Sequence, residues 1–340
     1  MADFSILQLV WFGLLGVLFI AYALLDGFDL GVGSCLPHFK NERSRRFALE
    51  TVAPVWDGNE VWLLTAGGAL FAAFPHVYAS VFSGLYTALV LLLGMLIFRV
   101  LALELRDKIE SASWRCFWDW SFCISSTMIA LLLGVAVGNL VAGLPVDASG
   151  EIDAGFLGLL NLLEPIPLLS GLLAVCLLRL HGALFLMIRT GEAEIRFDLL
   201  LRLTKEFAAT AIFYIALTAW IFVTAPSALH NFKEIPVIGI VPVAAALFLV
   251  ATGIFIRLQT FRLAFAGTAL TIVFLISTVG LGIFPNLVPA IPPENALTIA
   301  DSASDKTLLV MLVVAILGIP LVLLYHFWVY RAFAPKKISR

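Results

Sequence analysis

Charged side chains are scarce in this chain of 340 residues. Only 13% of them are Asp, Glu, Lys or Arg, whereas soluble domains carry about 25%. Hydrophobic residues make up 61% of the chain, and the mean hydropathy is +1.04. Short segments of alternating polarity, which a membrane β-barrel requires, are also missing. The composition therefore excludes an ordinary water-soluble domain and predicts an all-α polytopic membrane protein.

Residues that commonly hold metals are few. The four cysteines show no C-x-x-C spacing, which argues against a zinc site or a disulfide framework. Of the five histidines, only His181 falls deep within a predicted span. Because a haem group needs a well-placed axial ligand, we do not expect haem or another metal in this chain. We interpret His181 as a side chain that is hydrogen-bonded between helices.

Motifs of other functional classes are missing as well. The glycine-rich stretch "GFDLGVG" (27–33) lies inside an apolar run with no strand before it, so it is not a phosphate-binding loop. No cluster of basic residues suggests a nucleic-acid partner.

Apolar runs long enough to cross a membrane dominate the chain. A helix needs about 20 apolar residues to cross roughly 30 Å of hydrocarbon. Nine runs qualify: 6–36, 54–73, 77–99, 117–142, 159–187, 207–225, 237–256, 263–284 and 307–331. The first lacks the basic start and the cleavage site of a signal peptide, so we expect it to remain. We treat residues 1–340 as a single integral membrane domain.

Basic residues alternate between the connecting segments. All but three of the 21 lysines and arginines fall in 37–53, 99–116, 188–206, 257–262 or the C-terminal tail. Two of the other three, Lys233 and Lys306, lie in the intervening segments. The positive-inside rule then predicts an external N-terminus and a cytoplasmic C-terminus. The third, Arg179, lies within the fifth run, and its burial predicts a carboxylate partner in a structural ion pair.

Four carboxylates interrupt the first two apolar runs. Asp26 and Asp29 stand three apart in the first run, and Asp57 and Glu60 stand three apart in "PVWDGNEVWLLTAGGALFAAFP" (54–75). Residues three apart share a helix face. From the rise per residue, the first pair lies roughly 10–15 Å below the cytoplasmic surface and the second roughly 4–9 Å below it.

Carboxylates inside a bilayer are costly and often mark a proton route. For Asp57 and Glu60 we favour that interpretation, and we expect Asp57 to face Asp26 and Asp29. The alternative is that the acids cap helix ends or pair with Arg43, Arg45, Arg46 or Arg179, and for Asp26 both interpretations stay open. Gly27 and Gly31 should let a neighbouring helix approach closely.

Several of these stretches resemble a known family. "ALLDGFDLGVG" (23–33) and "APVWDGNEVWLLTAGGALFAAFPHVYA" (53–79) are similar to subunit II of cytochrome bd-type quinol oxidases. "WRCFWDWSF" (114–122) and "GVAVGNLVAGLPV" (134–146) fit the same family in order and spacing. The connecting segments 226–236 and 285–305 are short, as in the compact members called cyanide-insensitive oxidases.

The resemblance implies a fold and a partner. The family fold is two four-helix bundles, here 1–146 and 157–284, with 307–331 as the ninth helix. Subunit II is a haem-free companion of a subunit I that binds haem b, haem d and quinol in the bacterial cytoplasmic membrane. The complex oxidises quinol and reduces dioxygen to water, and the isolated chain is not expected to be active. The resemblance leaves open whether a small third subunit or a structural quinone is present.

The resemblance implies a role for one residue, and the residue types themselves suggest roles for several others. Protons for the reaction come from the cytoplasm, and Asp57 is the family-motif position we expect to matter most on their route. We expect Gly67 and Gly68 to form a smooth strip that packs within the bundle or against subunit I. Trp114, Trp118 and Trp120 are interpreted as anchors at the membrane boundary.

Two other functional classes compete with the oxidase. An ion-coupled secondary transporter would also carry buried carboxylates, but it should show helices interrupted at corresponding positions of two repeats. Pro165 and Pro167 have no such counterpart. A purely structural scaffold would explain the small residues but not the clustered acids.

Overall fold

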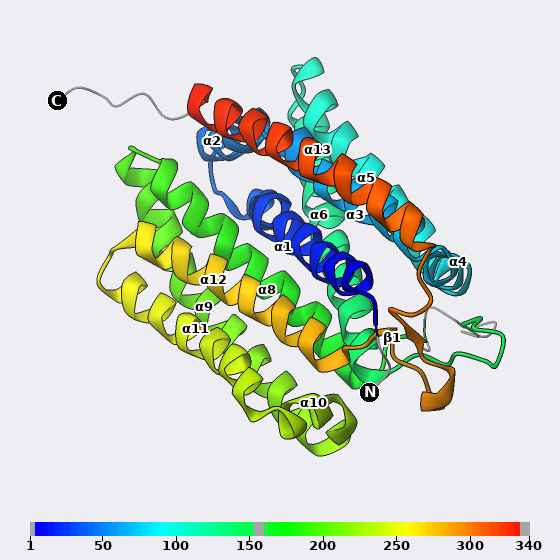
Figure 1. Cartoon of the computed structure of the whole chain (residues 1–340). Helices are drawn as coiled ribbons and strands as arrows, with labels where there is room; N and C mark the ends of the chain where they lie inside the picture. Colours follow the sequence, from blue (N-terminus) through cyan, green and yellow to red (C-terminus); the bar gives the residue numbers. More distant parts are fainter. Residues whose placement is uncertain (1–3, 153–159, 161, 334–340) are drawn as a thin grey trace.

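Long helices that run side by side make up most of the molecule (Figure 1). The computed structural model describes residues 4–152, 160 and 162–333. The long helices of the first half are α1 (Ile6–Cys35), α3 (Trp56–Ala73), α5 (Tyr86–Leu105) and α6 (Ala112–Ala142). Those of the second half are α8 (Pro165–Arg189), α9 (Ala193–Thr224), α11 (Ile240–Arg257), α12 (Phe261–Ile283) and α13 (Asp305–Ala332). The shorter helices are α2 (Glu42–Val52), α4 (Pro75–Gly84) and α10 (His230–Glu234).

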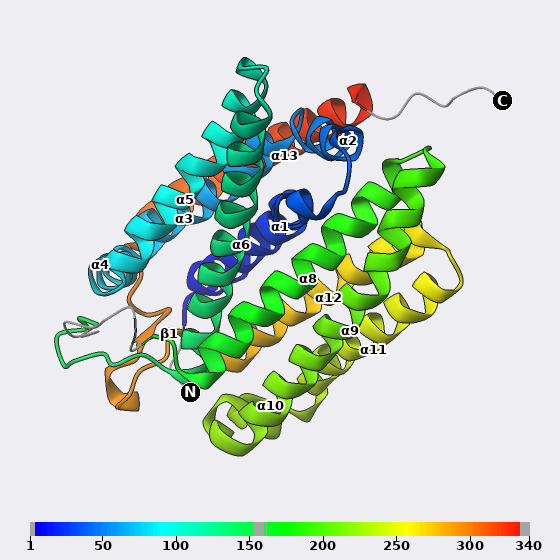
Figure 2. The same cartoon turned by 180° about the vertical axis from the view of Figure 1, so that it is seen from behind.

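Helix α1 lies at the centre of the structure. It runs between α3, α5 and α13 on one side and α8 and α12 on the other in both views (Figures 1 and 2). It begins with a capping box, in which Ser5 and Gln8 satisfy each other's backbone N–H groups. Its C-terminal part is buried on all sides from Asp26 to Cys35. The first two predicted carboxylates therefore sit in the interior rather than on a lipid-facing surface.

Glycines allow α1 and α8 to cross at close range. A Cβ atom added at Gly31 would lie 1.9 Å from the carbonyl oxygen of Leu178, and one added at Gly182 would lie 2.5 Å from the backbone nitrogen of Val32. Gly27 also faces Leu178. The expected close approach at Gly27 and Gly31 is confirmed, and the helix that approaches is α8.

Eight of the described helices are long and apolar enough to cross a membrane. Helix α3, the predicted second span, is not among them, although it is 18 residues long. Asp57, Asn59 and Glu60 lower the hydropathy of its first turns. The count of nine spans therefore stays a prediction.

The boundaries of several predicted elements were wrong. The run 77–99 is not one helix, because the chain breaks at Leu85 between α4 and α5. A Cβ atom at Gly84 would lie 2.4 Å from Cβ of Ile152, so this break also packs against a distant loop. Helix α9 begins at Ala193, ahead of the predicted 207, because hydropathy detects only the apolar part of a helix. Helix α2 was missed, since only one of its faces is buried.

The two ends of the helix bundle differ in the elements they hold. At one end, the strand β1 (Asn286–Val288) pairs antiparallel with β2 (Leu297–Thr298), and we call this the sheet end. The opposite end, which we call the basic end, holds α2 and the α5–α6, α8–α9 and α11–α12 turns (Figures 1 and 2). The predicted starts of the fifth span (159) and of the second bundle (157) lie outside the described residues.

Candidate functional site

A buried ion pair joins α1 to α5. The Nη1 atom of Arg99 donates to the Oδ2 atom of Asp26 over 2.7 Å, and its Nη2 atom donates to Oδ1. Both side chains are 0% exposed. The partner of Asp26 is therefore none of the four arginines proposed from the sequence. Arg99 lies inside the bundle because α5 continues past it to Leu105. A two-pronged contact of this kind fixes the geometry of both groups.

Asn59 connects α1, α3 and α13. Its Nδ2 atom donates to the Oδ2 atom of Asp29 over 2.7 Å, and its Oδ1 atom accepts from the hydroxyl of Tyr330 over 2.9 Å. Asn59 and Asp29 are both 0% exposed. The Oδ1 atom of Asp29 is buried and has no hydrogen-bond partner among the described residues. One oxygen of this carboxylate is thus held in place while the other keeps its capacity to accept.

Asp57 does not lie where the sequence led us to expect. It is exposed, whereas Asn59 two residues later is buried against Asp29. Successive helix positions turn by about 100°, so residues 57 and 59 point to nearly opposite sides. The prediction that Asp57 faces Asp26 and Asp29 was therefore wrong, because the polar side chain on that face is an amide.

Glu60 lies between the exposed and the buried acids. Its side chain is partly exposed. The charged groups that act on it are Arg99, Asp26 and Asp57. Glu60 is thus under the electrostatic influence of both members of the ion pair that joins α1 and α5.

The last helix contributes two residues that sequence reasoning missed. The Nε2 atom of His326 lies 3.0 Å from the carbonyl oxygen of Gly58 and 3.3 Å from the indole Nε1 of Trp62. His326 and Tyr330 are four residues apart and so face α3 together. This spacing on the final helix was the signal that could have found them.

The buried histidines do not offer free ligand atoms for a haem iron. The Nδ1 atom of His181 lies 2.7 Å from the hydroxyl of Thr268, its Nε2 atom lies 3.3 Å from the carbonyl oxygen of Leu24, and its ring stacks on Phe265. In His326, Nδ1 lies 2.8 Å from the carbonyl oxygen of Val322 and Nε2 lies 3.0 Å from that of Gly58, so both ring nitrogens face polar atoms of the chain. Across the described ranges, no group of three His, Cys, Asp or Glu side chains could hold a metal ion. Axial ligation by either ring would break these contacts.

Further ionic contacts, made by Arg179, Arg106 and Arg45, lie closer to the basic end. The Nη2 atom of Arg179 donates to Glu206 on α9 over 2.7 Å, so the carboxylate partner of Arg179 in the structure is Glu206. Arg106 donates to Asp119 over 2.5 Å and to Glu42 over 3.0 Å. Arg45 reaches the same Asp119 over 3.1 Å. These contacts join α2, α5 and α6, and α8 to α9, as structural ties.

The glycine strip of α3 lies on an open face. Apart from the adjoining backbone of α3, no atom of the described residues lies within 4 Å of a Cβ added at Gly67 or Gly68. The expectation that this strip packs within the bundle is therefore wrong. The strip is free to contact another chain or lipid.

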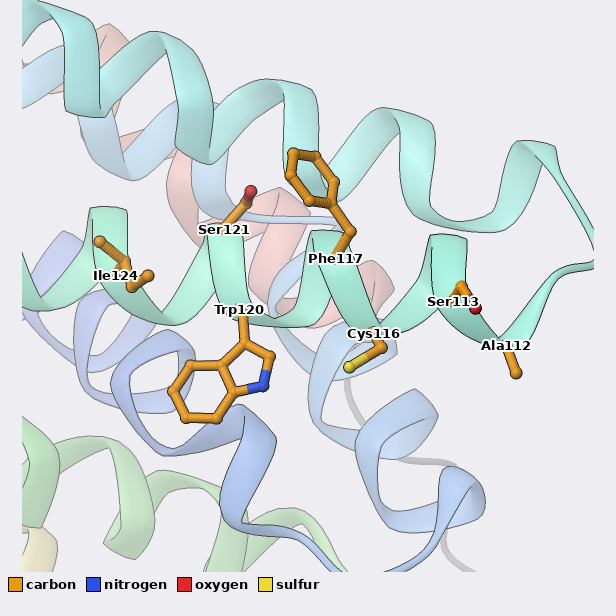
Figure 3. A pocket seen from close by; sticks show the side chains of 7 residues that line it. All are labelled: Ala112, Ser113, Cys116, Phe117, Trp120, Ser121 and Ile124. Atoms are coloured by element: carbon orange, nitrogen blue, oxygen red, sulfur yellow. The ribbon is translucent and has the colours of Figure 1, made fainter.

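An apolar surface hollow lies along α6. Its lining residues are Ala112, Ser113, Cys116, Phe117, Trp120, Ser121 and Ile124 (Figure 3). Trp120 is half-exposed, in keeping with an anchor at the membrane boundary. Trp118 is buried in the core instead, and Trp114 donates to the carbonyl oxygen of Leu105 over 2.8 Å. The hollow presents no cluster of reactive groups.

Comparison with known proteins identifies the family. The profile of "Cytochrome bd terminal oxidase subunit II" matches residues 7–333. This chain belongs to that family. It is therefore a subunit of a haem-containing terminal oxidase complex, and its partner is subunit I. Membership of this family argues against an ion-coupled secondary transporter.

Individual relatives agree along almost the whole chain. The cytochrome bd-I ubiquinol oxidase subunit 2 of Escherichia coli K12 is 36% identical, over 97% of this chain and 95% of the relative. The cytochrome bd ubiquinol oxidase subunit 2 of Bacillus subtilis is 33% identical, over 97% and 96%. In fold, the bd oxidase of Geobacillus thermodenitrificans matches with a TM-score of 0.78 at 20% sequence identity, covering 97% of this chain and 99% of that chain.

Proposed function

We propose that this subunit serves a quinol oxidase that reduces dioxygen to water, and that it supplies both a scaffold and a proton route. The names of the relatives from Escherichia coli and Bacillus subtilis, both ubiquinol oxidase subunits, support the substrate. Haem b and haem d belong to subunit I in this proposal. The engaged ring nitrogens of His181 and His326 support that assignment.

The proposed architecture keeps nine membrane spans. Helix α3 crosses the membrane beside α1 and α13, with its polar first turns covered by Asp29, His326 and Tyr330. The helices of 1–146 form one four-helix bundle, those of 157–284 form the other, and 307–331 is the ninth helix. The basic end faces the cytoplasm of a bacterial inner membrane, as the positive-inside rule requires.

The proton route follows the carboxylates of α3 and α1. Exposed Asp57 takes a proton at the basic end, and Glu60 passes it towards the interior. Arg99 offsets the charge of Asp26, so the buried group left to take and release the proton is Asp29. The observation that carries this proposal is the contact of Asn59 with Asp29, which fixes one carboxylate oxygen and leaves the other unpartnered.

The partner subunit docks on the open face of α3 in this proposal. Gly67 and Gly68 allow close approach there, and they leave Asp57 near the contact. A proton that enters at Asp57 is then close to the subunit that reduces dioxygen.

Purification of the tagged chain in mild detergent tests the assignment. We expect a second, larger chain and haem absorption bands to co-purify in a constant ratio. A colourless chain that is folded and alone in the membrane would contradict the proposed complex.

A further inference from the structure

Three arginines lie around the α11–α12 turn, at the basic end of the second half of the molecule. Arg257 lies in the last turn of α11, Arg262 lies in the first turn of α12, and Arg196 lies near the start of α9. All three side chains are exposed. We call this set the α11–α12 arginine cluster.

Backbone hydrogen bonds close the short turn between Arg257 and Arg262. Gln259 adopts a left-handed conformation with φ of 56°. The turn is closed by hydrogen bonds from Gln259 N–H to Ile256 over 3.1 Å and from Thr260 N–H to Phe255 over 3.0 Å. This tight helix ending keeps Arg257 and Arg262 on either side of one short turn.

A cation–π contact adds the third arginine. The Cζ atom of Arg196 lies 5.2 Å from the ring centroid of Phe261, the residue next to Arg262. Phe261 is buried and so forms a fixed base for the guanidinium. Arg196 is thereby held beside the turn, with its N–H donors free.

The positive charge of this cluster is not offset by the protein. In the part of the chain that the structure describes, none of the three arginines forms an ion pair. Of the acids around the start of α9, Glu192 pairs with Arg43 over 2.9 Å and Glu194 accepts from Asn41 over 2.9 Å, while Asp198 forms no ion pair with any of the three arginines among the described residues. Other arginines at this end do have carboxylate partners, as Arg45 and Arg106 show.

Apolar side chains flank the cluster: Leu258 lies in the turn itself, and Ile254 and Leu263 lie in α11 and α12 on its membrane side. Ile254, Leu258 and Leu263 are exposed at 52%, 65% and 52%. Helix α11 lies at the opposite edge of the molecule from α13, and α12 packs beside it (Figure 1). A subunit docked on the face of α3 therefore leaves this edge to lipid.

We propose that the α11–α12 arginine cluster binds the phosphate headgroup of one anionic phospholipid. Guanidinium groups match phosphate oxygens by paired N–H donors. The exposed apolar side chains of α11 and α12 lie where the acyl chains of that lipid would run. A basic pocket between membrane helices, next to the headgroup layer, is a setting in which anionic lipids bind.

Native mass spectrometry of the whole oxidase complex tests this site. The complex is exchanged into detergent micelles that contain either phosphatidylglycerol or phosphatidylcholine, and the bound lipids are counted. We expect the variant with Arg196→Gln, Arg257→Gln and Arg262→Gln to lose one bound phosphatidylglycerol. The control variant with Lys40→Gln, Arg46→Gln and Arg331→Gln removes equal charge from exposed residues at the same end and should keep it.

Several results would overturn the proposal. One is an equal count of bound phosphatidylglycerol in the two variants, and another is equal retention of phosphatidylcholine and phosphatidylglycerol by the unmodified complex. Displacement of the lipid by millimolar inorganic phosphate would show a site for free phosphate instead. If the triple variant does not assemble, the single variant Arg196→Gln is measured in the same way. None of these readouts depends on oxidase activity, so the proposed proton route can fail without affecting them.

Discussion

Asn59 donates its side-chain amide to Asp29 across the contact of α3 with α1, over 2.7 Å. The same amide group accepts from Tyr330 of α13. One neutral side chain therefore ties three helices together at the level of the buried carboxylates.

Replacing Asn59 by Leu tests this tie. The substitution leaves the carboxylate of Asp29 and the hydroxyl of Tyr330 without their partner, and each unsatisfied buried group costs about 1–3 kcal/mol. We expect a lower melting temperature of the assembled complex and a smaller haem yield. Tyr330→Phe, which removes only one of the two bonds, should have the smaller effect. Equal melting temperatures for both variants and the unmodified complex would show that the tie is unimportant.

Mutations of the ion pair of Asp26 and Arg99 should have non-additive effects. Removing one partner leaves an uncompensated buried charge, which costs about 3–5 kcal/mol. We expect Arg99→Gln and Asp26→Asn each to reduce the amount of assembled complex in the membrane. The double variant, which buries no charge, should recover much of it. A double variant that assembles worse than both single variants would argue that the charges themselves are needed.

Substitutions at Gly31 and Gly68 distinguish packing inside this chain from contact with subunit I. Gly31→Ala places a Cβ atom against the carbonyl oxygen of Leu178, so we expect loss of the chain itself from the membrane. A Cβ atom added at Gly68 meets no atom of the described residues within 4 Å, so Gly68→Leu should leave the chain in the membrane while lowering the amount of haem-loaded complex. Immunoblotting of the chain and haem absorbance measure the two effects. Full assembly of the Gly68→Leu variant would show that the strip faces lipid.

The orientation of the chain can be read with reporter fusions. Fusions after Arg46 and after Glu151 should report the cytoplasm and the exterior, respectively, because the first lies at the basic end and the second at the sheet end. The same compartment for both would contradict the proposed topology.

The sequence predicted the membrane class and most long helices, since each carries a run of apolar residues. It could not locate helix ends that continue in polar sequence, such as the start of α9, nor the one-faced helix α2. The family was identifiable because the run around Asp57 is long and unusual. The side-chain contacts of the residues in this run could not be predicted from the motif.

Side-chain pairing was the least predictable feature of the site. Arg99 was assigned to a connecting segment, because its depth depends on where α5 ends rather than on its neighbours in sequence. Asn59 drew attention only as a residue between two acids, although its helix face makes it the one that contacts Asp29. The rotation of α3 about its axis, which only packing determines, decides which of the polar residues is buried.

Proton uptake by the assembled oxidase after a single turnover tests the central claim most directly. In Asp57→Asn and in Glu60→Gln, size and much of the hydrogen bonding are kept while the exchangeable proton is lost. We expect normal haem spectra, slower oxygen consumption and delayed proton uptake in both variants. The control variant Glu110→Gln, which alters an exposed acid outside the route, should behave like the unmodified complex. Normal proton uptake and oxygen consumption in both variants at every pH tested would contradict it.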